Sequence, residues 1–183
     1  MNSLKADLWA RLQAARTTIL TKIDGLSEYD ARRAITPSGT NLLGLVKHLA
    51  GEEYGYLGET FGRPPAVRPG WFRDDPADEV DMWATPDEST AYIVGTYRDA
   101  ARHADETIRA LDLDSPGSVP HWAQEPDTTL GAMMVLMVGE TAQHAGHADT
   151  LRELIDGCTS HPNLAKPNQH RRVQEAAEAF KTI

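Results

Sequence analysis

The stretch from Glu140 to Gly157 reads ETAQHAGHADTLRELIDG and predicts a helix with three ionisable side chains on one face. Helical periodicity puts Glu140, His144 and His147 at positions i, i+4 and i+7, which project from the same side. Apolar residues flank the trio on that side, so we expect it to face the core: Leu130, Met133, Met137, Leu151, Leu154 and Ile155. Because an unpaired buried charge is costly, a metal ion is one partner that this face would accept.

A second stretch offers a third ligand. Residues 41–54 read NLLGLVKHLAGEEY, and they predict a helix in which His48 shares its side with Leu45, Leu49 and Glu52. Two helices that each carry ligands on an apolar face can meet at one metal ion. The spacing of a carboxylate and a histidine one turn apart is also typical of an ordinary surface pair, which remains the alternative.

The two segments LLGLVKHLAGEE and GETAQHAGHADTLRELIDG together resemble the DinB/YfiT-like metalloenzyme superfamily, in the branch of mycothiol S-transferases and mycothiol-dependent maleylpyruvate isomerases. The resemblance covers roughly residues 4–157 and implies an all-α four-helix bundle in up-down-down-up order. Many members hold their metal with three histidines, whereas the mycothiol isomerase branch uses a histidine, a glutamate and a histidine. The implied ligands here are therefore His48, Glu140 and His144, around a divalent metal expected to be Zn²⁺.

The resemblance also implies an activity: a metal-dependent S-transferase that conjugates a low-molecular-weight thiol, expected to be mycothiol, to an electrophile through a metal-bound thiolate. No catalytic residue is implied beyond the metal centre. His147 and Arg152 extend from the motif as candidate thiol contacts or supports for the ligands, and salt bridges from Arg152 to neighbouring acids are the alternative. Two other functions stay open, a metal-dependent hydrolase or amidase using metal-bound water, and a non-catalytic DinB-like protein that binds metal.

Length and charge narrow the remaining possibilities. With 183 residues we expect one domain, 1–183, with a bundle core of about 4–157 and an extension over 158–183. The formal net charge of −9 argues against nucleic acid and anionic membrane surfaces as partners. Cys158 is the only cysteine, which is compatible with a reducing compartment. We expect a cytoplasmic protein without a signal segment, and the extension is available to dock on the bundle or on a second subunit of a homodimer.

The periodicity and the breaking residues predict four long helices. Their expected bounds are Ser3 to Ile23, Asn41 to Phe61, Thr85 to Leu111, and Thr128 to Ile155, with a short helical turn over 27–34. The long connection over 62–86 contains several bulky aromatic residues, which we expect to pin it over the bundle; a wall of the substrate pocket is the alternative. A second connection, 112–126, carries His121 and Trp122, which are expected to pack within the loop or to line the site opening.

Overall fold

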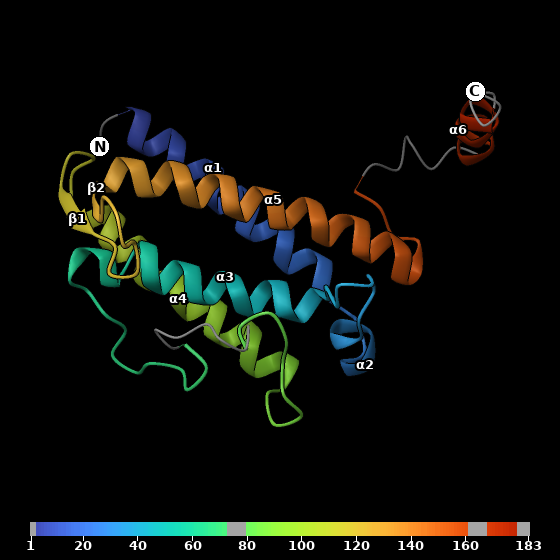
Figure 1. Cartoon of the computed structure of the whole chain (residues 1–183), viewed down its shortest axis with the longest axis horizontal. Helices are drawn as coiled ribbons and strands as arrows, with labels where there is room; N and C mark the ends of the chain where they lie inside the picture. The colour runs from blue at the N-terminus through green and yellow to red at the C-terminus, as the bar shows by residue number, and fades with distance from the viewer. Residues whose placement is uncertain (1–2, 73–79, 161–167, 179–183) are drawn as a thin grey trace.

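The computed structural model describes residues 3–72, 80–160 and 168–178. Its framework consists of four long helices, α1 (Ser3–Ile23), α3 (Leu42–Tyr56), α4 (Thr90–Ala110) and α5 (Leu130–Asp156), shown in Figure 1. The shorter elements are α2 (Glu28–Arg32), the 3-10 helix η1 (Glu59–Phe61), strands β1 (Pro116–Ser118) and β2 (Asp127–Thr129), and helix α6 (Gln169–Glu178). The predicted all-α fold is confirmed, with a two-stranded antiparallel hairpin as its only described sheet.

The directions of the long helices follow the up-down-down-up order. In Figure 1, α1 and α5 run from left to right, whereas α3 and α4 run from right to left. An ion pair of 2.6 Å between Lys22 and Asp149 joins the last turns of α1 to the second half of α5. Tyr54, near the end of α3, lies against His103 in the second half of α4, with ring centroids 5.8 Å apart. The connection between Tyr56 and Thr90 is long enough to let α3 and α4 run parallel.

Side-chain caps begin the helices, and they place some ends differently from the sequence prediction. Asn41 caps α3 by accepting a hydrogen bond of 2.7 Å from the Gly44 amide. The third helix was predicted from Thr85 but begins at Thr90, because the Ser89 side chain takes the cap position. Helix α3 ends at Tyr56 and not at Phe61, where the chain has tightened into η1.

The interior has two apolar clusters with polar side chains between them. One cluster joins the end of α1 to α3, the first half of α4 and the second half of α5. The other joins the beginning of α1 to the end of α4 and the first half of α5. Between these clusters lie buried polar groups, namely Arg16, Glu53, Asp105, Thr141 and His144. This polar layer crosses the bundle at the level of the motif on α5.

The Arg16 guanidinium satisfies the charges on the α1 side of this layer. It donates two hydrogen bonds of 2.6 Å to the fully buried carboxylate of Glu53 and one of 2.7 Å to Asp105. Trp9 and Gln13 each add a hydrogen bond of 2.8 Å to Asp105. Each buried carboxylate is therefore paired, as the cost of burying an isolated charge requires.

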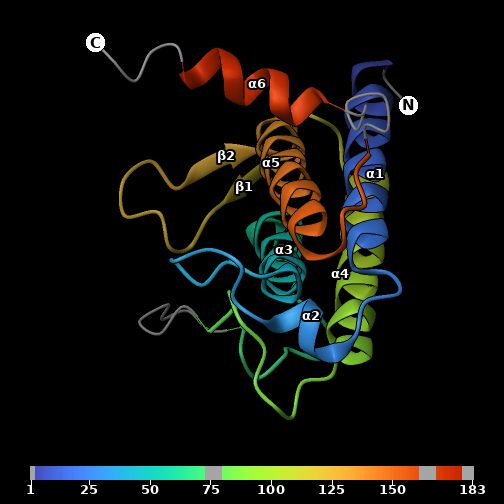
Figure 2. The same ribbon diagram turned by 90° about the vertical axis from the view of Figure 1, so that its right-hand side faces the viewer.

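The described residues after α5 and the hairpin lie at the surface of the bundle. Helix α6 has no buried residue, and Cys158 is exposed. The β1 and β2 hairpin projects on the side of α3 and α5 in the rotated view of Figure 2. Among the helices in the described ranges, none combines the length and the apolar composition that crossing a bilayer requires.

Candidate metal centre

Three of the side chains singled out from the sequence converge between α3 and α5. His48, Glu140 and His144 each offer a ligand atom, and these atoms all lie within 4.8 Å of one another. The Nε2 atom of His144 is 3.6 Å from Oε2 of Glu140, and the rings of the two histidines meet edge to face at 5.0 Å between centroids. Two ligands of a tetrahedral zinc ion, each about 2.1 Å from the metal, lie about 3.4 Å apart. The separation of His144 and Glu140 is thus close to that of two ligands sharing an ion.

The orientation of His48 is set by Asp81, which sequence analysis did not single out. The Nδ1 atom of His48 lies 2.7 Å from Oδ2 of Asp81. Burial by itself would lower the pKa of His48, but the hydrogen bond to Asp81 and the charges of Glu52, Asp81 and Glu140 raise it above its usual value. With Nδ1 engaged, Nε2 is the nitrogen of His48 that is left for a metal.

His144 is held in its neutral form. Burial, followed by the positive charge that His48 and His147 would carry, lowers the pKa of His144 from 6.5 to about 4. Its Nδ1 atom is buried and has no hydrogen-bond partner among the described residues. A neutral imidazole keeps a lone pair, which is the form that coordinates metals.

Carboxylates give this region an excess of negative charge. Glu52 lies one helical turn after His48 on α3 and makes no hydrogen bond or ion pair within the described ranges. Burial raises its pKa from 4.5 to about 7; the charge of His48 opposes this shift, whereas Glu140 and Asp81 reinforce it. A bound cation would offset the negative charge that these carboxyl groups bring to the region. The residues present therefore fit a divalent metal in both ligand chemistry and charge.

His147 and Arg152 do not join this cluster. The sequence predicted all three motif residues on the buried face, but His147 is exposed, and its ring meets the His144 ring edge to face at 5.6 Å between centroids. That part of the prediction was wrong because the buried face turns towards Thr141, Ala145 and Ala148. Arg152 donates to Asp156 at 2.8 Å and to the carbonyl groups of Lys22 and Asp24, around the end of α1, at 2.9 and 2.7 Å. The alternative of a salt bridge from Arg152 to a neighbouring acid is therefore confirmed. A contact of Arg152 with a thiol stays a prediction.

The two long connections place aromatic side chains at the surface of α3. Trp71 is buried, with the Lys47 ammonium 5.1 Å from its ring centroid, so it pins its connection to the bundle as predicted. Tyr56 contacts both His121 and Trp122 of the hairpin, with ring centroids 5.7 and 6.1 Å apart. Whether either group lines a substrate pocket remains a prediction.

Comparison with known proteins gives one finding that covers most of the chain. The model of the family described as mycothiol S-transferase matches residues 7–157. This range includes all four long helices except the first residues of α1, together with His48, Glu140 and His144. A separate search of curated proteins found no match. The match extends over well more than half of the sequence, and the chain therefore belongs to the mycothiol S-transferase family.

Proposed function

We propose that this protein is a metal-dependent thiol S-transferase that joins a low-molecular-weight thiol, mycothiol in the first instance, to an electrophilic small molecule. The observation that carries the proposal is the convergence of His48, Glu140 and His144 on one point between two helices. Three protein ligands leave a fourth position of a zinc ion open, which is the arrangement of catalytic zinc sites and not of structural ones. Family membership supports the thiol as the molecule that uses this position.

The residues around the centre have distinct tasks in the proposed reaction. His48 and His144 bind as neutral imidazoles, and Glu140 offsets part of the charge of the cation. The metal, when bound, supplies Lewis acidity that lowers the pKa of a coordinated thiol. Glu52, one helical turn after His48 on α3, is suited to accept the proton that the thiol loses. The thiolate sulfur would then form a bond to the electrophilic carbon, and the leaving group would depart with the electron pair of the bond that breaks.

The test compares turnover of a chloro-dinitroarene with mycothiol, with a different low-molecular-weight thiol and with no thiol, each before and after chelation. We expect activity only with a thiol, the highest rate with mycothiol, and loss of the rate on chelation. Equal rates with and without thiol would reject a transferase and favour a hydrolase that uses metal-bound water. Indifference to chelation in all three reactions would reject any metal-based mechanism.

A variant pair controls for general effects of mutation. His144→Ala should lose both bound metal and activity, since it removes a ligand from the cluster. Glu153→Gln changes an exposed residue on the same helix and should keep both. The finer parts of the proposal, which are a cytoplasmic location, a homodimer, and thiol contacts from His147 and Arg152, require separate measurements of location, mass in solution and thiol affinity.

A further inference from the structure

The segment that carries Asp81 is packed tightly against α3. Gly44 makes this possible, because a Cβ atom at this position would lie only 1.9 Å from the carbonyl oxygen of Met82. The same carbonyl accepts a hydrogen bond of 3.2 Å from the Asn41 side chain. On the other side, the Lys47 ammonium donates a hydrogen bond of 2.9 Å to the carbonyl of Trp83. The backbone on the C-terminal side of Asp81 is thus fixed to the helix that carries His48.

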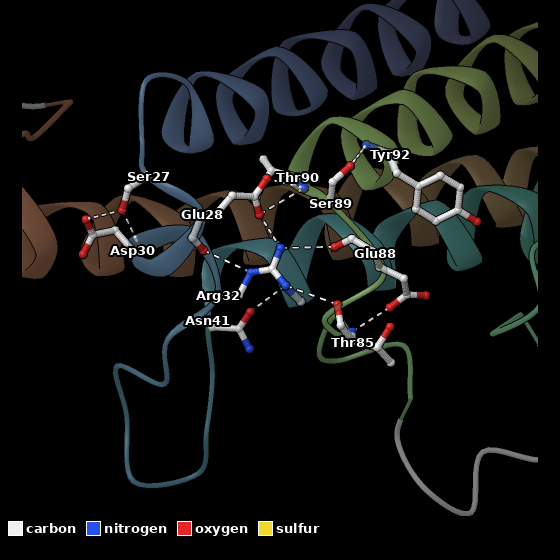
Figure 3. A network of polar contacts seen from close by, with 11 residues as sticks. Ser27, Glu28, Asp30, Arg32, Asn41, Thr85, Glu88, Ser89, Thr90 and Tyr92 are labelled. Carbon is white, nitrogen blue, oxygen red and sulfur yellow. Dashed lines mark hydrogen bonds and ion pairs between the residues drawn. The ribbon is translucent and has the colours of Figure 1, made fainter.

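A network of polar contacts, shown in Figure 3, continues this anchorage into α2 and α4. The Glu88 carboxylate accepts hydrogen bonds of 2.8 Å from both Lys47 and the Thr85 amide. Arg32 donates to the carbonyl groups of Thr85 and Glu88 at 3.2 Å, and the Arg32 guanidinium also pairs with Glu28. Residues 80–89 form no helix or strand themselves, but contacts from α2 and α3 hold them in place.

The contact between Asp81 and His48 has a defined polarity. The two side chains are joined by a contact of 2.7 Å between Oδ2 of Asp81 and Nδ1 of His48, and an aspartate is ordinarily ionised at neutral pH. An ionised carboxylate can only accept hydrogen bonds, which requires the Nδ1 atom of His48 to carry the hydrogen. The neutral form of His48 then has its lone pair on Nε2. A carboxylate in this place also makes the imidazole a stronger ligand.

We propose that Asp81 is a positioning residue of the metal centre, which selects the Nδ1–H tautomer of His48 and aims its Nε2 atom at the ion. The inference rests on the metal centre proposed above. It adds a residue from a connecting segment to a site whose ligands all come from two helices. The competing explanation is an ordinary surface ion pair that ties residues 80–89 to α3, with no influence on metal binding.

Metal affinity separates these explanations. Zn²⁺ binding, measured by competition with a fluorescent chelator, should weaken about 10- to 100-fold in Asp81→Ala, as loss of a carboxylate partner of a ligating histidine typically does. Asp81→Glu should recover part of the affinity, because it restores the charge and the acceptor. The matched control is Asp30→Asn: the Asp30 side chain is 36% exposed against 33% for Asp81, and it also forms one ion pair of similar length, 3.0 Å to Arg33. This control should bind Zn²⁺ like the wild type.

A second measurement does not depend on whether the variants fold. Long-range ¹⁵N–¹H correlation spectra of the metal-free wild-type protein above the pKa of His48 should show the hydrogen on Nδ1. A hydrogen on Nε2 would overturn the proposal, and so would Zn²⁺ affinity in folded Asp81→Ala within about threefold of the wild type. If the wild type itself binds no Zn²⁺, the proposed function fails; if it binds Zn²⁺ and Asp81→Ala binds equally well, only the role of Asp81 fails.

Discussion

Replacing Glu52 by glutamine should stabilise the metal-free protein at alkaline pH. The folded protein raises the pKa of Glu52 from 4.5 to about 7, chiefly through burial. Between these two pH values the unfolded chain has already lost its proton while the folded protein keeps it, so the free energy of unfolding falls as pH rises. The full difference in the pKa of Glu52 corresponds to a loss of about 3 kcal/mol in the free energy of unfolding above pH 7. Because the side chain is partly accessible to solvent, we expect a loss of about 2 kcal/mol.

The measurement is urea unfolding in the presence of a chelator at pH 5 and pH 8. The free energy of unfolding of Glu52→Gln, relative to that of the wild type, should be about 2 kcal/mol higher at pH 8 than at pH 5, because glutamine has no charge to bury. Glu153→Gln, an exposed substitution on α5, serves as the control and should show no such pH dependence. An equal difference between Glu52→Gln and wild type at both pH values would refute the electrostatic reasoning. We also expect Glu52→Gln to bind Zn²⁺ several-fold more weakly, because the site loses negative charge.

Three further predictions concern the ligands and the framework. In metal analysis, Glu140→Ala should lose stoichiometric metal, whereas Glu140→His should retain it because an imidazole can replace the carboxylate. Retained metal in the alanine variant would show that Glu140 is not a ligand. Arg16→Met should lower the free energy of unfolding by about 3–5 kcal/mol in denaturant titrations, because it leaves the buried Glu53 carboxylate without its partner; a loss below about 1 kcal/mol would contradict this. Gly44→Ala should reduce both the melting temperature and the Zn²⁺ affinity, because its Cβ collides with the Met82 carbonyl; an unchanged melting temperature would count against the close packing.

Part of the cluster could be predicted from helical periodicity, and the family resemblance supplied the rest by implying His48 as the third ligand and leaving His147 out. Glu140 and His144 are one turn apart, and His48 lies on the apolar face of a helix whose Asn41 cap is also recognisable. The exposure of His147 was not predictable at this level. His147 follows Glu140 by seven residues, which is a rotation of about 700° around the helix axis, or 20° short of two full turns. A small rotation of the whole helix therefore decides whether His147, at the edge of the apolar face, is exposed to solvent.

Features that depend on tertiary contacts escaped the sequence analysis. Asp81 reaches His48 because a connecting segment is fastened to α3, and no periodic pattern marks such a residue. The start of α4 was misplaced because Pro86 and Ser89 are both good start signals, and only the hydrogen bond from the Tyr92 amide to Ser89 decides between them. Strands β1 and β2 have three residues each, too few to show an alternating pattern.

Two adjacent residues of α3 contact groups on opposite sides of the bundle, and this limits the insertions and deletions that the helix can accept. Glu52 is near His48 and Glu140, whereas Glu53 is clamped by Arg16 of α1. One residue inserted or deleted between His48 and Glu52 would rotate the two halves of the helix by about 100° relative to each other. Either His48 would leave the cluster with Glu140 and His144, or Arg16 would lose its contact with the Glu53 carboxylate. Exposed positions of this protein can accept substitutions, but the number of residues between His48 and Glu52 has to stay the same.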